Sequence, residues 1–169
     1  MGVIGAIWGV LGVLSILVFA VARLMPVAVE AISMDLLWYH WVVLIGNTLF
    51  MMHSEGYRGF QTAFSPRVAA RARYLLHRPT FKSVLLAPFF CIGYFDSSRR
   101  RKIVVYTLTI GILILIGLVR VLDQPWRGII DAGVVVGLSW GFVATSAFVI
   151  YAFCSHRFEH DPEVITSSK

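Results

Sequence analysis

The sequence predicts an all-α integral membrane protein with four transmembrane helices and both termini in the cytoplasm. Charged residues make up only 14% of the 169 residues, and the mean hydropathy is +0.78. This composition leaves too few polar side chains to cover a water-soluble surface. Four apolar stretches approach or exceed the length needed to cross the roughly 30 Å hydrocarbon core of a bilayer. They are residues 3–24, 36–52, 103–122 and 129–153.

The first apolar stretch is expected to stay in the chain as a span. It ends in a pattern, Ala20-x-Ala22, that resembles a signal-peptide cleavage site. However, no basic region precedes it, and it is longer than the usual apolar part of a signal peptide. We therefore count residues 3–24 as the first transmembrane helix.

A fifth apolar run, residues 84–95, is too short to cross the membrane. It has twelve residues and is interrupted by Pro88 and Gly93. Apolar runs of this length are typical of interfacial or re-entrant segments, and both alternatives stay open here. A fifth crossing would also split the basic residues on either side of it between two faces of the membrane.

Positive charge is concentrated between the second and third spans. Ten of the fifteen lysines and arginines fall within residues 53–102, against only two acidic residues there. Because basic loops are retained on the cytoplasmic side, this long loop is expected in the cytoplasm, and both termini with it. The chain then forms one membrane domain, residues 1–155, and a short cytoplasmic tail, residues 156–169. The expected location is a bacterial-type inner membrane.

An amphipathic helix is predicted within the basic loop. Ser65 is the expected N-cap, Pro66 fits the first helical position, and Pro79 ends the pattern. Its arginines are typical of a helix that lies on the inner leaflet and contacts anionic lipid phosphates. The residues expected to bind lipid or another anion are Arg58, Arg67, Arg71, Arg78, Arg99, Arg100 and Arg101.

Glycines recur at a spacing of four in two of the predicted spans. Gly133, Gly137 and Gly141 lie on nearly one face of the last span. Gly5 and Gly9 repeat this spacing in the first span. Because such faces let helix backbones approach closely, we expect the first and last spans to pack together. Alternatively, one of these faces joins the chain to a second copy or to a partner membrane protein.

Polar side chains on the second span form the main candidate for chemistry. His40, Asn47 and Ser54 recur at intervals of seven, which predicts a polar stripe inside the membrane. The candidate catalytic residues at the cytoplasmic end of this stripe are His53, Glu55 and Arg58. The imidazole and the carboxylate would act as acid and base, with the guanidinium holding an anion. The alternative is structural, with Glu55 paired to Arg58 and His53 among lipid headgroups.

No cofactor is expected. A bis-histidine haem within one subunit would lack its second ligand, because His40 and His53 lie about 140° apart around one helix and neither of the last two spans contains a histidine. Only an oligomer or a partner subunit would supply that ligand. Zinc would find ligand types in the tail, at Cys154, His156 and His160, but their spacing matches no known zinc finger.

These features lead us to expect a non-enzymatic accessory, scaffold or lipid-associated membrane protein that binds anionic headgroups. The first alternative is a membrane enzyme that acts on a lipid or amphipathic substrate through His53, Glu55 and Arg58. The second is a small channel or transporter that uses His40 and Asn47. A nucleic-acid partner is not expected, because the basic residues adjoin membrane spans.

Overall fold

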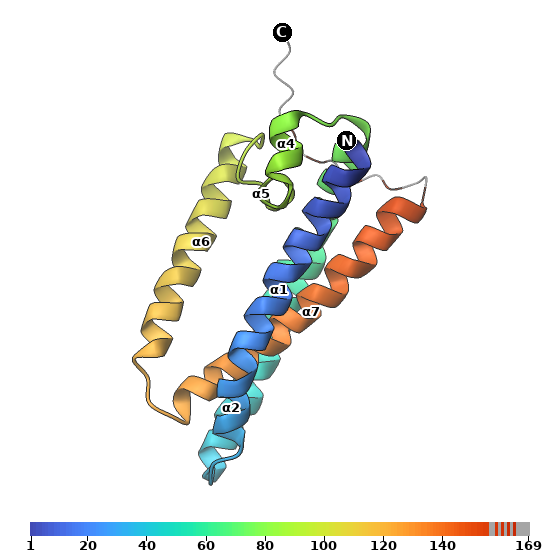
Figure 1. Ribbon diagram of the computed structural model, residues 1–169. Coiled ribbons are helices and arrows are strands. Elements are labelled where there is room, and N and C mark those ends of the chain that lie inside the picture. Colours follow the sequence, from blue (N-terminus) through green and yellow to red (C-terminus); the bar gives the residue numbers. More distant parts are fainter. Residues whose placement is uncertain (156–157, 159, 161, 163, 165–169) are drawn as a thin grey trace.

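A computed structural model shows an all-helical chain and describes residues 1–155, 158, 160, 162 and 164 (Figure 1). Within these residues, three helices, α1, α6 and α7, are long and apolar enough to cross a membrane. The helices in chain order are α1 (Gly2–Ile32), α2 (Trp38–Met51), the π-helix η1 (Met52–Phe64), α3 (Ser65–His77), α4 (Phe81–Leu85), α5 (Ala87–Ile92), α6 (Arg99–Arg120) and α7 (Trp126–Cys154).

The second predicted span continues far beyond its expected end. Residues 38–77 form one uninterrupted helical run through α2, η1 and α3, where we expected a span over 36–52 and then a loop. The α2 part has 14 residues, or about 21 Å, which alone is shorter than the hydrocarbon core. Ser65 is therefore no N-cap. Its hydroxyl instead shares a 2.9 Å hydrogen bond with Thr145 of α7.

The glycine face of α7 receives this helical run. Gly133 lies against Asn47 and Met51, Gly137 against Glu55, and Gly141 against the ring of Phe60. A Cβ at Gly133 or Gly141 would collide with α2 or η1, and one at Gly137 would lie 3.1 Å from the Glu55 carboxylate. The face is thus covered within the chain, whereas we had considered it for α1 or for a second molecule.

The glycine face of α1 is covered by the short helices α4 and α5. Gly5 contacts Val84, and Gly9 contacts Ala87 and Cys91. The segment 84–95 is therefore folded back onto α1 as two short helices. Gly93 ends α5 in the left-handed conformation, with φ of 105°, which a residue with a side chain rarely adopts.

Helices α1 and α7 do pack together, as expected, but through residues other than the predicted pair of glycine faces. Near the C-terminal end of α1, Ala31 contacts Gly128 at the start of α7. Ala28 joins Ile129, Ala132 and Leu44 of α2 in a small buried cluster there. Small side chains thus set the closest approach of these two long helices.

Helix α3 belongs to the main core and does not lie apart as a surface helix. Val68, Ala72 and Leu75 are buried with α1 residues and with Phe90 of α5. The sequence pattern shows an apolar face on this helix, and that face is buried against protein, because α1, α5 and α7 surround it.

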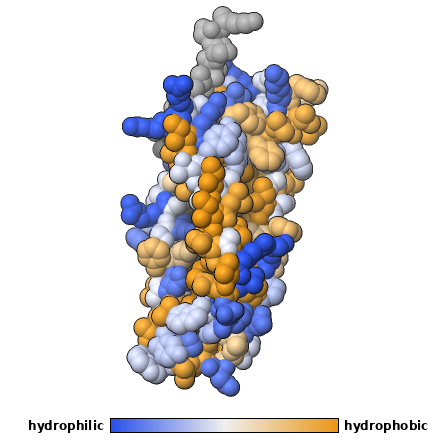
Figure 2. Space-filling view, turned by 90° about the vertical axis from the view of Figure 1, so that its left-hand side faces the viewer, coloured by the Kyte–Doolittle hydropathy of each residue, from blue (hydrophilic) through white to orange (hydrophobic). Residues whose placement is uncertain are grey.

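Helix α6 stands beside the bundle and is joined to it mainly at its two ends (Figure 1). Its two buried residues are Val105 and Val119. Its other apolar side chains are exposed, including Leu113 at 63%. Figure 2, which looks at the α6 side, shows a hydrophobic stripe along the molecule, with hydrophilic residues near its upper end and in patches on both sides of it. Lipid is the medium that such a surface requires.

Substituting Gly141 tests the packing of η1 on α7. A Cβ at Gly141 would lie 2.5 Å from Cγ of Phe60, so Gly141→Leu should separate the helices and lower the free energy of unfolding by about 1 to 3 kcal/mol. The matched control is Gly111→Leu in α6, because a Cβ at Gly111 meets nothing within 4 Å. Equal stability of the two variants in detergent unfolding would contradict this packing.

Candidate functional site

The three residues of the predicted polar stripe are all hydrogen-bonded within the chain. The Leu37 N–H donates to Nδ1 of His40 at 3.2 Å. Nδ2 of Asn47 donates to the Ile129 carbonyl at 2.9 Å. The Ser54 hydroxyl donates to the Phe50 carbonyl at 2.7 Å. The His40 bond lies at the start of α2, the Asn47 bond joins α2 to α7, and the Ser54 bond links η1 to the end of α2. Each residue thus has a structural role.

His40 lies in an aromatic cluster at the start of α2. Its ring centroid is 4.2 Å from that of Tyr39 and 5.0 Å from that of Trp126. The histidine is only 8% exposed. Aromatic rings of this kind gather at membrane–water interfaces. The position of His40 is therefore that of an anchor between α2 and the start of α7.

The candidate catalytic residues lie on η1, beside the central part of α7. Glu55 packs against Gly137. The exposed His53 stacks on Tyr57 with ring centroids 5.9 Å apart, and Arg58 is exposed. Among the described residues, no hydrogen bond or ion pair joins any two of these three candidates. The predicted acid, base and anion clamp are thus not assembled into one site.

Side-chain hydrogen bonds to the backbone accompany the π-helical form of η1. The Ser54 and Thr62 hydroxyls each donate to the carbonyl four residues earlier, at 2.7 and 2.8 Å. Such bonds compete with the N–H that an α-helix would place there. Gly56 and Gly59 relax the backbone between them. Because π-helices are rare and often mark functional places, this segment is of interest even without an assembled catalytic site.

Most of the predicted lipid-binding arginines gather at one end of the molecule. There the end of α3, helix α4 and the start of α6 come together near the N-terminus (Figure 1), and a Cβ at Gly2 would touch the Leu76 carbonyl. We call this region the basic end; its exposed or half-exposed cations are Arg73, Arg78, Lys82, Arg99, Arg100, Arg101 and Lys102. Sequence reasoning grouped four of these together and missed Arg73, Lys82 and Lys102 as site residues.

Arg58, Arg67 and Arg71 differ from the rest of the predicted group. Arg58 lies on η1, beside α7 and away from the basic end. Arg67 is half-buried on α3 and interacts within the protein. Arg71 is 3% exposed, so its guanidinium is turned to the protein interior. The expectation of one continuous arginine surface on α3 therefore does not describe this helix.

Arg71 holds several segments of the basic end together. Its guanidinium donates to the carbonyls of Phe90 at 2.7 Å and Asp96 at 3.2 Å. Nε donates to the Pro162 carbonyl at 3.0 Å, and the group lies 4.9 Å from the centre of the Phe90 ring. A buried charge of this kind is stable only when its donors are satisfied. Arg71 thus fixes α5, the turn after it and part of the C-terminal segment onto α3.

The two cysteines of the chain lie in different surroundings. Cys91 is buried in the core at 1% exposure, while Cys154 is exposed at the end of α7. His156 lies outside the described residues. Among the residues that are described, no three side chains of metal-ligating type come together.

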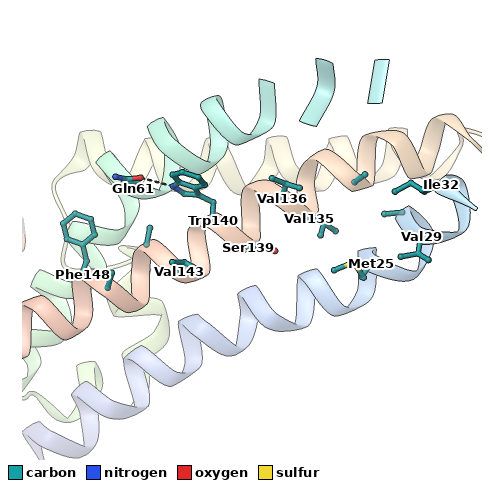
Figure 3. Close-up of a pocket in the computed structure, with 14 residues that line it drawn as sticks. Met25, Val29, Ile32, Gln61, Val135, Val136, Ser139, Trp140, Val143 and Phe148 are labelled. Carbon is teal, nitrogen blue, oxygen red and sulfur yellow. Dashed lines mark hydrogen bonds between the residues drawn. The ribbon is translucent and has the colours of Figure 1, made fainter. Parts of the chain in front are cut away.

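An apolar groove that the sequence did not indicate runs along α7 (Figure 3). It has a volume of about 790 Å³ and lies between α7 and the C-terminal half of α1. Gln61 of η1 lies at its side, where Oε1 accepts a 2.9 Å hydrogen bond from the indole N–H of Trp140. Its lining residues are scattered over three helices, so only the folded arrangement brings them together.

Comparison with protein-family models, with curated proteins and with solved structures finds no match to this chain.

The two cysteines should differ strongly in reactivity. Burial raises the pKa of the Cys91 thiol to about 12, although the nearby positive charge of Arg71 acts in the opposite direction. Because this pKa exceeds 9, Cys91 stays protonated from pH 7 to 9 and should resist maleimide throughout that range. Mass spectrometry should find the label on Cys154 alone. Labelling of Cys154→Ser in folded protein would contradict this burial, whereas labelling after unfolding is expected.

Proposed function

We propose that this chain is a non-enzymatic, multi-pass membrane protein, an accessory or scaffold that binds anionic lipid headgroups through its basic end. The observation that carries this proposal is the gathering of exposed cations from α3, α4 and α6 at one end of the molecule. Lysines and arginines close to an anionic membrane surface each contribute about 1 kcal/mol to its binding.

Exposed apolar side chains beside the basic end support a location at the membrane surface. Phe81, Leu85 and Phe89 on α4 and α5 are 74%, 64% and 50% exposed. The Trp8 indole N–H donates to the Leu85 carbonyl at 3.4 Å. In an interfacial segment, apolar side chains enter the acyl region while neighbouring cations contact lipid phosphates. The interfacial alternative for residues 84–95 is therefore favoured over the re-entrant one.

The distribution of charge supports the proposed topology. Gln124, in the turn between α6 and α7, donates to Oε2 of Glu30 near the end of α1 at 3.3 Å. This opposite end also carries Asp35, Asp123 and Asp131, against Arg120 and Arg127, so positive charge is not in excess there. The positive-inside rule then assigns the basic end to the cytoplasm, together with the start of α1 and the end of α7. In this arrangement α2 and η1 jointly form a fourth crossing, and the membrane is a bacterial-type inner membrane.

The two alternative functions have less geometric support. An enzyme would need His53, Glu55 and Arg58 to converge, and they contact different surroundings. A conduit along His40 and Asn47 would need polar groups that face an open path, and both side chains bond to nearby backbone. A Glu55→Gln variant with unchanged lipid binding would agree with the proposal.

The proposal predicts that cations of the basic end determine how many anionic lipids the protein keeps. In Arg99→Gln/Arg100→Gln, the apparent affinity for an anionic phospholipid should fall about fivefold for each charge removed. Native mass spectrometry of protein titrated with anionic or zwitterionic phospholipid in mild detergent would measure this.

The matched control is Arg23→Gln/Arg120→Gln, which removes two exposed arginines that lie outside the basic end. This control should keep the lipid affinity of the wild type. Equal losses in the two double variants, or no preference of the wild type for anionic lipid, would refute the proposal.

A further inference from the structure

A second, smaller cavity lies at the basic end and is lined by cations. It has a volume of about 210 Å³ and lies between the end of α3 and the C-terminal segment. Its charged or titratable lining residues are Arg73, Tyr74, His77, Arg78 and His160, and no carboxylate lines it among the described residues. We call this cavity the basic pocket.

Hydrogen bonds hold part of this lining in place. Arg73 donates to the Ser155 carbonyl at 3.2 Å, and its own carbonyl bonds Nδ1 of His77 at 2.9 Å. Phe158 stacks on His160 with ring centroids 4.9 Å apart. Arg78 follows the last residue of α3 and is exposed. The pocket therefore combines cations on positioned backbone with an aromatic wall, which suits a phosphoryl group.

The apolar groove and the basic pocket meet at one contact. Phe148 lines the groove, and its ring centroid is 6.0 Å from that of His160, which lines the pocket. The groove extends along α7 from Ala132 to Phe148, which corresponds to about 24 Å of helix. The long apolar groove thus lies next to a small pocket that carries two arginines.

We infer that the groove and the basic pocket together bind one anionic phospholipid, with its phosphate in the pocket, a hydrocarbon tail in the groove, and the Phe148–His160 contact between them. The inference rests on the proposed function and adds a specific site to it. The groove is long enough for an acyl tail, because one leaflet is only about 15 Å of hydrocarbon deep. Ser139 and Gln61 give the otherwise apolar groove a few polar groups, as in most lipid-sized pockets.

The shape and charge of the groove and the pocket favour a lipid over a free anion. A free phosphate would use only the 210 Å³ pocket and leave the adjoining groove without a role. The groove also lies between α1 and α7, two helices apolar enough to cross a membrane, so hydrocarbon surrounds its opening. One molecule with a phosphate head and an apolar tail satisfies both parts.

The test measures how many phospholipids remain bound to the full chain in mild detergent, by native mass spectrometry. Ala147→Trp fills the groove at an exposed lining residue and should weaken retention roughly tenfold, since it displaces about two methylene groups of the tail. Arg78→Gln removes one cation of the pocket and should weaken retention about fivefold. The wild type should retain one anionic phospholipid per chain.

Two matched controls separate the site from its surroundings. Leu113→Trp places the same large side chain on the exposed face of α6, and Arg120→Gln removes an exposed arginine that lies outside the basic end. Both should retain the single tightly bound lipid within about twofold. Circular dichroism and unfolding of each variant should match the wild type, which shows that the variants fold.

Three results would overturn the inference. If Ala147→Trp and Arg78→Gln retain lipid as the wild type does, while Arg99→Gln/Arg100→Gln loses it, the basic end binds lipid without this site and the proposed function survives. If inorganic phosphate alone displaces the bound molecule, the pocket is a free-anion site. If the retained lipid is lost in Ala147→Trp but shows no preference for an anionic head, the headgroup assignment and the proposed function both fail.

Discussion

The close contact between α7 and the helical run from α2 through η1 is the constraint on which the rest of the fold depends. Three glycines spaced by four residues remove side chains from one face of α7, so backbone and short contacts replace interlocking side chains. The hydrogen bond from Asn47 to the Ile129 carbonyl fixes one end of this contact, and that between Ser65 and Thr145 fixes the other. Between these two hydrogen bonds, η1 packs along α7 and does not leave the bundle as a loop.

This contact explains how so polar a segment remains ordered. Residues of η1 bond to their own backbone, as Ser54 and Thr62 do, or to α7, as Gln61 does through Trp140. The bundle then continues into α3, where Arg71 gathers carbonyls from α5, the following turn and the C-terminal segment. The charge of Arg71 is therefore structural, while the cations around it stay exposed. The same sequence region thus supplies both a buried anchor and the basic end.

The surface of α6 and the basic end differ in chemistry, and both fit a membrane environment. Helix α6 exposes apolar side chains nearly all along its length, which water would not stabilise and lipid would. The cations at the start of α6 lie beside exposed aromatic and aliphatic side chains of α4 and α5. The groove along α7 lies next to the basic pocket, where Phe148 contacts His160. A lipid environment suits the apolar surface of α6, the apolar groove and the basic end.

The sequence by itself determined the helical class, the membrane environment and the ends of several elements, because hydropathy, charge bias and proline positions act locally. Helix α3 ends at His77, just before Pro79, as its pattern predicts. Only the tertiary structure decided which helix covers each glycine face, since Gly137 and Gly5 carry the same local signal but meet Glu55 and Val84. It likewise decided that Arg71 is buried while Arg78 is exposed, and that Phe148 meets His160. Burial and contacts between helices depend on residues that lie far apart in the sequence, and a local sequence pattern does not show which of these residues meet.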